Sequence, residues 1–452
     1  MKALKTPDGP RSPAFWQLSR FGRDTVCFLE RCRRTYGPVF RLKFPFSPPV
    51  FVLSDAELIV ELLNRDVDET PPFPANRGTT SIFGRYSLLF KSGAEHRAER
   101  SLLTPFLNRK ATDAARGGID QIIDQFLEEL DGSQPTISVY GFTHRLALCI
   151  AISQFWGCEE DDLVRRIEEA VETSRRRYKT FRHMVLDSLA MERDDHPIAS
   201  AFFRMVQGQE RERLRSTFRD LIDEHVRAMR SDPARLNENP ISARLQVGGH
   251  ADRAVDEAYV DFCMTLLVAG YDPPASITAW LLLELAQQPD LQERIRVECA
   301  EGDSVKVSAA SPSLQASVLE AYRLYPPLHS ITRTALQPVR LGEYELPGGS
   351  YIMPSIYLLH RESKHWDAPE QFRPDRFERL ERVPSLEQGF LPFGAQKRVC
   401  PGRHFAGVLI ERTISTIVSR FDIIKVDDVP APQTFGPTLV PSDTARIALV
   451  RR

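Results

Sequence analysis

The sequence predicts a mainly α-helical protein with a smaller β part. Residues 94–232 carry apolar residues three and four apart among charged ones, which is the spacing of amphipathic helices. Residues 252–288 are apolar on nearly every face, as expected of a buried helix. In contrast, residues 38–54 and 339–355 alternate in polarity around proline and glycine, which indicates short strands.

Composition places the chain among ordinary globular proteins. Of its 452 residues, 42% are hydrophobic and 27% are charged, which argues against disorder. The chain has 59 Lys and Arg residues and 61 Asp and Glu residues, for a net charge of −2. Its overall charge therefore does not favour binding to nucleic acid. No repeat, low-complexity tract or long linker marks a boundary. We therefore expect one domain over residues 1–452, with residues 1–36 as a lead-in segment.

The individual elements follow in chain order. Residues 38–54 predict a hairpin of two strands, and residues 210–232 predict an amphipathic helix whose charges form a solvated face. Residues 252–288 predict one long central helix that ends before Pro289. At 1.5 Å per residue its length would be about 50 Å. Residues 403–420 predict the final helix.

The ends and the cysteines point to a cytoplasmic protein. The first residues are polar and rich in proline, without the apolar core of a signal peptide. No run of about 18 uncharged apolar residues occurs, so no membrane anchor is expected. Seven cysteines without a CxxC pair indicate reduced thiols.

Cys400 differs from the other six cysteines because it directly precedes a predicted helix. Unpaired N–H groups and the positive end of the helix dipole favour a thiolate there. A thiolate binds metals or attacks electrophiles. The alternative is a buried structural cysteine, which is the expected role of the other six.

The segment around Cys400 resembles the haem-binding loop of the cytochrome P-450 family. That loop reads Phe-x-x-Gly-x-Arg/His-x-Cys-x-Gly, with an alanine four residues further on. The matching residues here are Phe393, Arg398, Cys400, Gly402 and Ala406. Gln396 departs from the pattern, because the family has glycine at that position. Glycine there usually permits a special backbone angle.

Further signatures of the family occur in the family's order. Glu320 and Arg323 match its Glu-x-x-Arg pair, and residues three apart on a helix share a face. A third partner would be Arg376, in a segment that resembles the Pro-Glu-Arg-Phe meander with Asp375 in place of Glu. The resemblance runs from about residue 37 to the C-terminus.

The resemblance implies haem b with Cys400 as its thiolate ligand. It also implies cofactor contacts from the loop and from residues that bind the haem propionates. The residues concerned are His96, Arg100, Arg333, Phe393, Arg398 and Gly402. Arginine suits this role because its fork of donors matches a carboxylate. For His96 and Arg100 the alternative is an ordinary surface face of a helix.

The central helix departs from the family at one position. Ala269, Gly270 and Asp272 match the family's motif, but Pro273 stands where the family has threonine. That hydroxyl generally assists proton delivery during oxygen activation. We therefore expect atypical activation, with protons from the substrate, from Asp272 through water, or from Ser276. The alternative is that Pro273 and its neighbour only fix a kink.

The resemblance implies a monooxygenase that oxidises a medium-sized apolar small molecule, such as a secondary-metabolite intermediate. The alternatives are oxidative coupling, nitration, peroxide-driven oxidation or rearrangement by a haem-thiolate enzyme, and a non-catalytic partner protein of the same fold. Electrons would come from NAD(P)H through a separate ferredoxin- or flavodoxin-type protein, docked near Lys397 and Arg403. The expected substrate-lining positions are residues 73–90, Thr265, Ala269 and residues 328–332.

Overall fold

The computed structural model describes most of the chain in two compact units. The described residues are 5–45, 47–65, 69–72, 83–130, 136–158, 160–178, 209–231, 239–247, 255–301, 311–435 and 438–452. The first unit comprises Met1–Thr104, Ala151–Ala269 and Ile331–Ser355, and the second comprises Pro105–Ile150, Gly270–Ser330 and Ile356–Arg452. A single domain over residues 1–452 stays a prediction.

The first unit contains a four-stranded sheet in the order β1-β2-β7-β4 and a hairpin of β5 and β6. The strands are β1 (Val39–Leu42), β2 (Val50–Leu53), β4 (Arg333–Thr334), β5 (Val339–Leu341), β6 (Tyr344–Leu346) and β7 (Tyr351–Pro354). Val39 pairs with Leu53 in antiparallel register, so the hairpin predicted in residues 38–54 is confirmed. β7 joins β2 in parallel, which connects two distant predicted strand segments.

Helices account for most of the other described residues of the first unit. They are α1 (Ala14–Arg23), α2 (Thr25–Tyr36), α3 (Ala56–Leu63), α5 (Gly93–Leu107), the π-helical turn η1 (Ile152–Trp156), α9 (Asp161–Tyr178), α12 (Gln209–Ser231) and α13 (Pro240–Val247). The predicted lead-in segment forms α1 and α2. The amphipathic helix predicted in residues 210–232 is α12.

The second unit is built around α20 (Arg403–Arg420), which packs on α7, α15 and α17. Its helices are α6 (Arg109–Ala114), α7 (Arg116–Glu128), α8 (Val139–Ala151), α15 (Pro289–Glu301), α17 (Pro312–Leu324), α18 (Ile356–Leu359) and α19 (Asp375–Glu378), with 3-10 turns η4 (Leu386–Gln388) and η5 (Gln396–Arg398). The predicted final helix over residues 403–420 is confirmed. Ile410, Ile414 and Ile417 on α20 are fully buried, as the predicted apolar stripe requires.

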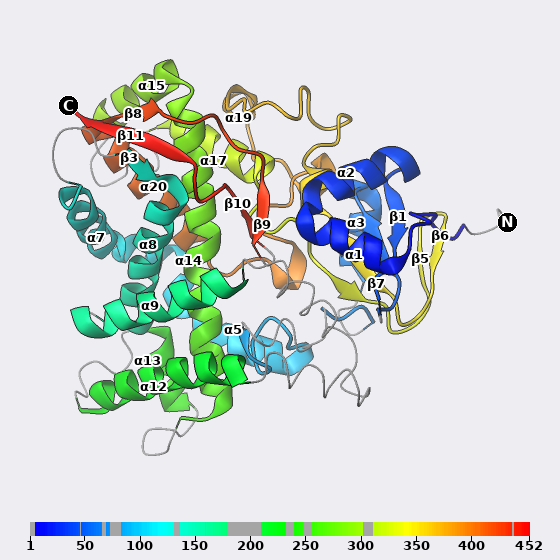
Figure 1. Ribbon diagram of the computed structural model, residues 1–452, viewed down its shortest axis with the longest axis horizontal. Helices are drawn as coiled ribbons and strands as arrows, with labels where there is room; N and C mark the ends of the chain where they lie inside the picture. Colours follow the sequence, from blue (N-terminus) through cyan, green and yellow to red (C-terminus); the bar gives the residue numbers. More distant parts are fainter. Residues whose placement is uncertain are drawn as a thin grey trace. The chain divides into compact units, whose positions relative to one another are not determined.

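The strands of the last 32 residues form two small sheets, one of which also includes β3 from earlier in the chain. The sequence did not indicate these sheets. Their strands are β3 (Thr136–Ser138), β8 (Phe421–Lys425), β9 (Gln433–Phe435), β10 (Thr438–Val440) and β11 (Arg446–Arg451). β11, the long red arrow in Figure 1, lies between β3 and β8. β9 and β10 form the second sheet.

The long helix α14 (Glu257–Ala286) contributes to both units. It is shorter than the predicted 252–288 and stays helical through Pro273 and Pro274. Its length and composition would suffice to cross a membrane, but 78% of its most apolar window is buried inside the protein. Such burial is typical of the core helix of a globular fold.

Candidate functional site

The loop before α20 holds Cys400 at the N-terminus of that helix. The Cys400 N–H donates to the Phe393 carbonyl over 2.8 Å, which closes the loop around η5. Gly402 is the N-cap of α20, so Cys400 lies two residues before the first free N–H groups of the helix. Cys400 is half-buried and in no disulfide. These surroundings favour a thiolate that can bind a metal.

Gln396 adopts the left-handed backbone conformation that glycine usually supplies. Its φ is 56°, and Gly394 in the same loop has a φ of 68°. A side chain in this region costs about 1–2 kcal/mol, because Cβ approaches the following carbonyl. The departure from the family's glycine therefore leaves the loop conformation in place and adds local strain.

Tyr322 of α17 packs beneath this loop. Its ring lies 4.8 Å from that of Phe393, measured between centroids, and the side chain is buried. Burial first, and then the nearby charges of Cys400 and Glu411, raise the pKa of Tyr322 well above its ordinary value. Tyr322 thus supplies a neutral, buried hydroxyl close to the thiol. Sequence reasoning missed this residue, although it lies within the Glu-x-x-Arg segment.

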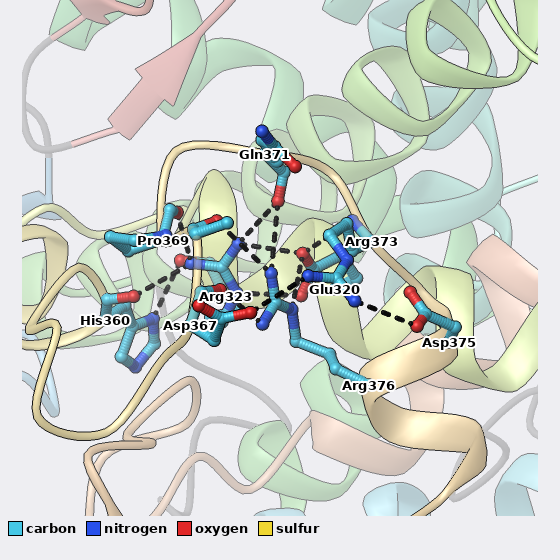
Figure 2. A network of polar contacts seen from close by, with 10 residues as sticks. Glu320, Arg323, His360, Asp367, Pro369, Gln371, Arg373, Asp375 and Arg376 are labelled. Atoms are coloured by element: carbon cyan, nitrogen blue, oxygen red, sulfur yellow. Dashed lines mark hydrogen bonds and ion pairs between the residues drawn. The ribbon is translucent and has the colours of Figure 1, made fainter.

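Glu320 and Arg323 form a buried ion pair on α17. The Arg323 Nε and Nη2 groups donate to the two carboxylate oxygens of Glu320 over 2.7 and 2.8 Å, and neither side chain is exposed. Arg376 Nε and the Arg373 backbone N–H add hydrogen bonds of 3.1 and 2.8 Å to Glu320 (Figure 2). The predicted association of Glu320, Arg323 and Arg376 is confirmed. The bidentate geometry and the extra donors are what a buried ion pair requires.

Arg323 uses its remaining donors on the backbone of the meander. Nη1 donates to the carbonyls of His360 and Pro369 over 2.9 and 2.8 Å, and Nη2 donates to that of Gln371 over 3.1 Å. The Arg323 guanidinium also lies 5.4 Å from the Trp366 ring centroid. One side chain therefore fixes the path of residues 360–371, as Figure 2 shows.

His360 connects this network to the cysteine loop. The Leu391 N–H donates to Nε2 over 2.8 Å, so Nε2 is the acceptor and Nδ1 carries the proton. Nδ1 lies 3.1 Å from the Arg323 carbonyl and donates to it. Burial first, and then the charge of Arg323, lower the pKa of His360 to about 3, which keeps the ring neutral. Sequence reasoning gave His360 no role.

The proton-delivery candidates Asp272 and Ser276 lie on the face of α14 that packs on β10. Asp272 accepts hydrogen bonds from Tyr140 and Thr438 over 2.7 and 2.5 Å. The Ser276 hydroxyl donates to the Leu439 carbonyl. Both side chains are buried, and residues four apart share a helix face. Their hydroxyl and carboxylate groups therefore anchor a strand, and a role in proton delivery stays a prediction.

The other candidates on α14 are less buried than their neighbours. Ala269 is exposed, and Gly270 and Pro273 are half-buried, in a helix that is otherwise mostly buried. Proline lacks the N–H that would bind the carbonyl one turn earlier. A small group could therefore approach the helix backbone at Ala269 and Gly270.

The predicted haem-propionate residues belong to both units. His96 is buried and Arg100 is half-buried, one turn apart on α5, and Arg333 lies on β4. These three are in the first unit, whereas Arg398 of η5 is in the second with Cys400. The contacts of these residues with haem stay a prediction.

The surroundings of Arg333 indicate whether this chain could bind an anionic cofactor. Burial lowers the pKa of its guanidinium, and its Nη1 donates a long hydrogen bond of 3.4 Å to the Thr332 carbonyl. Among the described residues no carboxylate forms an ion pair with it. Arg333 is half-buried, and a cation that is partly removed from water is stabilised by an anion. The propionate of haem would supply one, so this residue and Cys400 both fit the cofactor.

The substrate-lining segments are described only in part. Residues 73–82 lie outside the described residues. Thr265 is buried and its hydroxyl contacts the loop over residues 83–90. Leu328 is 38% exposed, whereas His329 is buried, and burial lowers the pKa of its imidazole to about 4. A substrate-binding role for these residues stays a prediction.

A cysteine loop that is connected by hydrogen bonds to a buried Glu-x-x-Arg pair is typical of haem-thiolate enzymes. The family model of cytochrome P-450 matches residues 7–448, so the chain belongs to the cytochrome P-450 family. The match begins earlier than the expected residue 37, and it therefore includes α1 and α2. Proteins of this family are iron-containing oxidoreductases that bind haem through a cysteine thiolate.

Relatives of the chain occur in bacteria and plants. Cytochrome P-450 135A1 of Mycobacterium tuberculosis is 26% identical over 455 residues, which cover 98% of this chain and 95% of the relative. Cytochrome P-450 71A22 of Arabidopsis thaliana is also 26% identical, over 93% and 87% of the two chains. The solved structure of retinoic-acid-bound cyanobacterial CYP120A1 covers both chains completely, with a TM-score of 0.81 and 20% identity. It supports the fold, which is mainly α with a smaller β part.

Proposed function

We propose that the protein is a monooxygenase that oxidises a medium-sized apolar small molecule, with secondary-metabolite intermediates among its substrates. Family membership and the position of Cys400 at the N-terminus of α20 support this function. Haem, when bound, supplies the iron that activates oxygen for transfer to the substrate. Cys400 would hold the iron, and Arg333 would hold a propionate together with His96, Arg100 and Arg398.

Pro273 supports the more specific part of the proposal, which is an atypical route of proton delivery during oxygen activation. It offers no donor at the family's threonine position, and the groups nearest to it on α14 are engaged elsewhere. Asp272 accepts from Tyr140 and Thr438, and Ser276 donates to a backbone carbonyl. We infer that protons come from the substrate, from Asp272 through water, or from Ser276, with water held at the carbonyls of Ala269 and Gly270 as the carrier.

The same observation favours a second candidate function. A reaction that needs little proton delivery would tolerate Pro273, and oxidative coupling, nitration, peroxide-driven oxidation and rearrangement are of this kind. Labelled dioxygen distinguishes the two functions, because a monooxygenase incorporates one of its atoms into the product. Substitution Pro273→Thr should change turnover or coupling, and unchanged turnover, coupling and product would contradict the atypical route.

We propose that an acidic ferredoxin- or flavodoxin-type protein delivers the electrons at the cysteine loop. Lys397 and Arg403 are exposed there. A cavity of about 280 Å³ lies beside Arg403, with a mainly apolar lining that includes Leu319, Val383 and Phe393. Charge complementarity favours an acidic partner. Lys397→Glu and Arg403→Glu should raise the apparent KM for the partner, and an unchanged KM would remove this site.

The first experiment is the absorption spectrum of the dithionite-reduced protein with carbon monoxide. A red-shifted Soret band would establish thiolate ligation, and Cys400→Ser should abolish the band. Cys158→Ser is the matched control, because Cys158 is a buried cysteine far from the loop in sequence. Bound haem without that band in the native protein would contradict the oxygenase. Failure to bind haem would instead support a non-catalytic partner protein.

A further inference from the structure

The second unit contains a cavity of about 490 Å³ that shares no lining residue with the cysteine loop or with the predicted substrate-lining segments. The ends of α14 and α17, the segment over residues 357–372 and residues 429–432 contribute its lining. Leu324, Phe372 and residues 429–432 give it apolar surface. A cavity of this size can hold a small organic molecule.

Arg361 lines this cavity and has donors that the described residues leave unused. Its side chain is 6% exposed, and its guanidinium lies 3.8 Å from the centroid of the Tyr357 ring. Nε donates to the Glu370 carboxylate over 2.9 Å. Nη1 is buried and has no hydrogen-bond partner among the described residues. A buried donor without an acceptor is unfavourable, so this edge of the guanidinium favours a bound acceptor.

A purely structural arginine in the same region looks different. Arg323 is also buried, but its Nε, Nη1 and Nη2 groups all donate to the protein. Arg361 instead pairs through Nε alone with Glu370, whose side chain is 65% exposed. An ion pair with such an exposed partner compensates the charge of Arg361 only weakly.

Glu284 is the other carboxyl group at the cavity. Its Oε1 accepts a 2.5 Å hydrogen bond from the Tyr325 hydroxyl. Burial raises the pKa of this carboxyl to about 7. Below that pH Glu284 is therefore mainly neutral, and it does not repel an anion bound at Arg361.

We propose that this cavity is a second ligand site, which binds a small monocarboxylate with an apolar body. The carboxylate would accept from the Nη1 and Nη2 edge of Arg361, because two parallel donors match its two oxygens. The apolar body would pack on Phe372 and residues 429–432. A neutral ligand of the same shape would leave the charge of Arg361 uncompensated. The site is additional to the proposed oxidation, because its ligand does not bind at Cys400.

Calorimetric titration of the full-length holoprotein with phenylacetate at about pH 6 tests this site. The haem iron is first saturated with phenylimidazole, so that binding over the haem contributes no heat. We expect one phenylacetate per chain. Phenylacetamide, a neutral analogue of the same shape, should bind about tenfold more weakly. Absence of phenylacetate binding, or equal affinity for the two probes, would overturn the proposal.

Substitutions of the two residues of the ion pair should have opposite effects. Arg361→Gln removes the guanidinium and should weaken phenylacetate binding about tenfold. Glu370→Gln removes a competing carboxylate, retains the guanidinium and should strengthen binding several-fold. General damage to the fold would weaken binding in both variants. Native affinity in Arg361→Gln, or weaker binding in Glu370→Gln, would overturn the role of Arg361. The titration requires no turnover, so failure of this site and failure of the monooxygenase proposal are distinguishable.

Discussion

The hydroxyl of Tyr140 donates a 2.7 Å hydrogen bond to the carboxylate of Asp272, which lies 132 residues later in the chain. Thr438 donates to the other carboxylate oxygen over 2.5 Å. Asp272 therefore joins α8, α14 and β10 directly beside Pro273. The carboxylate is buried, and it fixes the conformation of the helix segment where the family's motif is altered.

We expect Tyr140→Phe to destabilise the protein by about 2 kcal/mol, because hydrogen bonds to charged groups are worth about 1.5–3 kcal/mol. Thr438→Val should cost a similar amount. Urea denaturation midpoints measure both effects. The matched control is Thr444→Val, at an exposed threonine, which should change stability by less than about 0.5 kcal/mol. Equal stability of Tyr140→Phe and the native protein would show that the hydrogen bond from Tyr140 to Asp272 does not stabilise the fold.

Substitution Gln396→Gly should stabilise the cysteine loop. Glycine removes about 1–2 kcal/mol of left-handed strain and costs about 0.5–1 kcal/mol in chain entropy, so the expected gain is between zero and about 1.5 kcal/mol. Lys397→Gly is the control, because residue 397 is equally exposed and its φ is not in the left-handed region. It should destabilise the loop. Thermal release of haem measures both, and a loss in Gln396→Gly would contradict the strain.

Breaking the Glu320–Arg323 pair should cost about 3–5 kcal/mol, because Glu320→Gln leaves the Arg323 charge buried without a counter-ion. Haem retention after size exclusion and the denaturation midpoint both report this loss. The exposed pair of Arg165 and Glu169 provides the comparison. Glu169→Gln should leave both measurements unchanged. Similar effects of the two substitutions would mean that the buried network does not hold the meander.

The cysteine loop and the Glu-x-x-Arg pair could be predicted because their spacing is local. Residues 320 and 323 share one helix face, and Cys400 lies one short loop before α20. The final helix was equally clear from its apolar stripe. These features depend on neighbours in sequence, and the structure confirms the pairing of Glu320, Arg323 and Arg376.

Other contacts could not be predicted because they join residues that are distant in the sequence, at least 46 positions apart. β11 pairs with β3, which is only three residues long and gives no alternation to detect. Nothing in the sequence around Asp272 indicated that Tyr140 and Thr438 would bind it. Likewise, nothing in the sequence indicated that Asp261 would bind Arg215 of α12 and the backbone N–H of Tyr86. Such pairings are set by tertiary packing rather than by local pattern.

The last prediction concerns pH and the buried pair of Glu284 and Tyr325. The Tyr325 hydroxyl donates to Glu284 over 2.5 Å, and burial raises the pKa of this carboxyl to about 7. The folded state therefore binds a proton that the unfolded state, with a pKa near 4.5, releases. The resulting stabilisation is complete below pH 4.5 and is lost as the pH rises to about 7.

Glu284→Gln removes this titration and should make the protein more stable than the native form by roughly 3 kcal/mol at pH 8, with little difference at pH 4.5. Tyr325→Phe retains the carboxyl but removes the hydrogen bond that favours its charged form, so it should move the pH window upward. Denaturation midpoints between pH 4.5 and 8 measure both changes. Parallel pH curves for the native protein and Glu284→Gln would show that the carboxyl does not titrate in this range, because its burial would then impose no cost on the charged form.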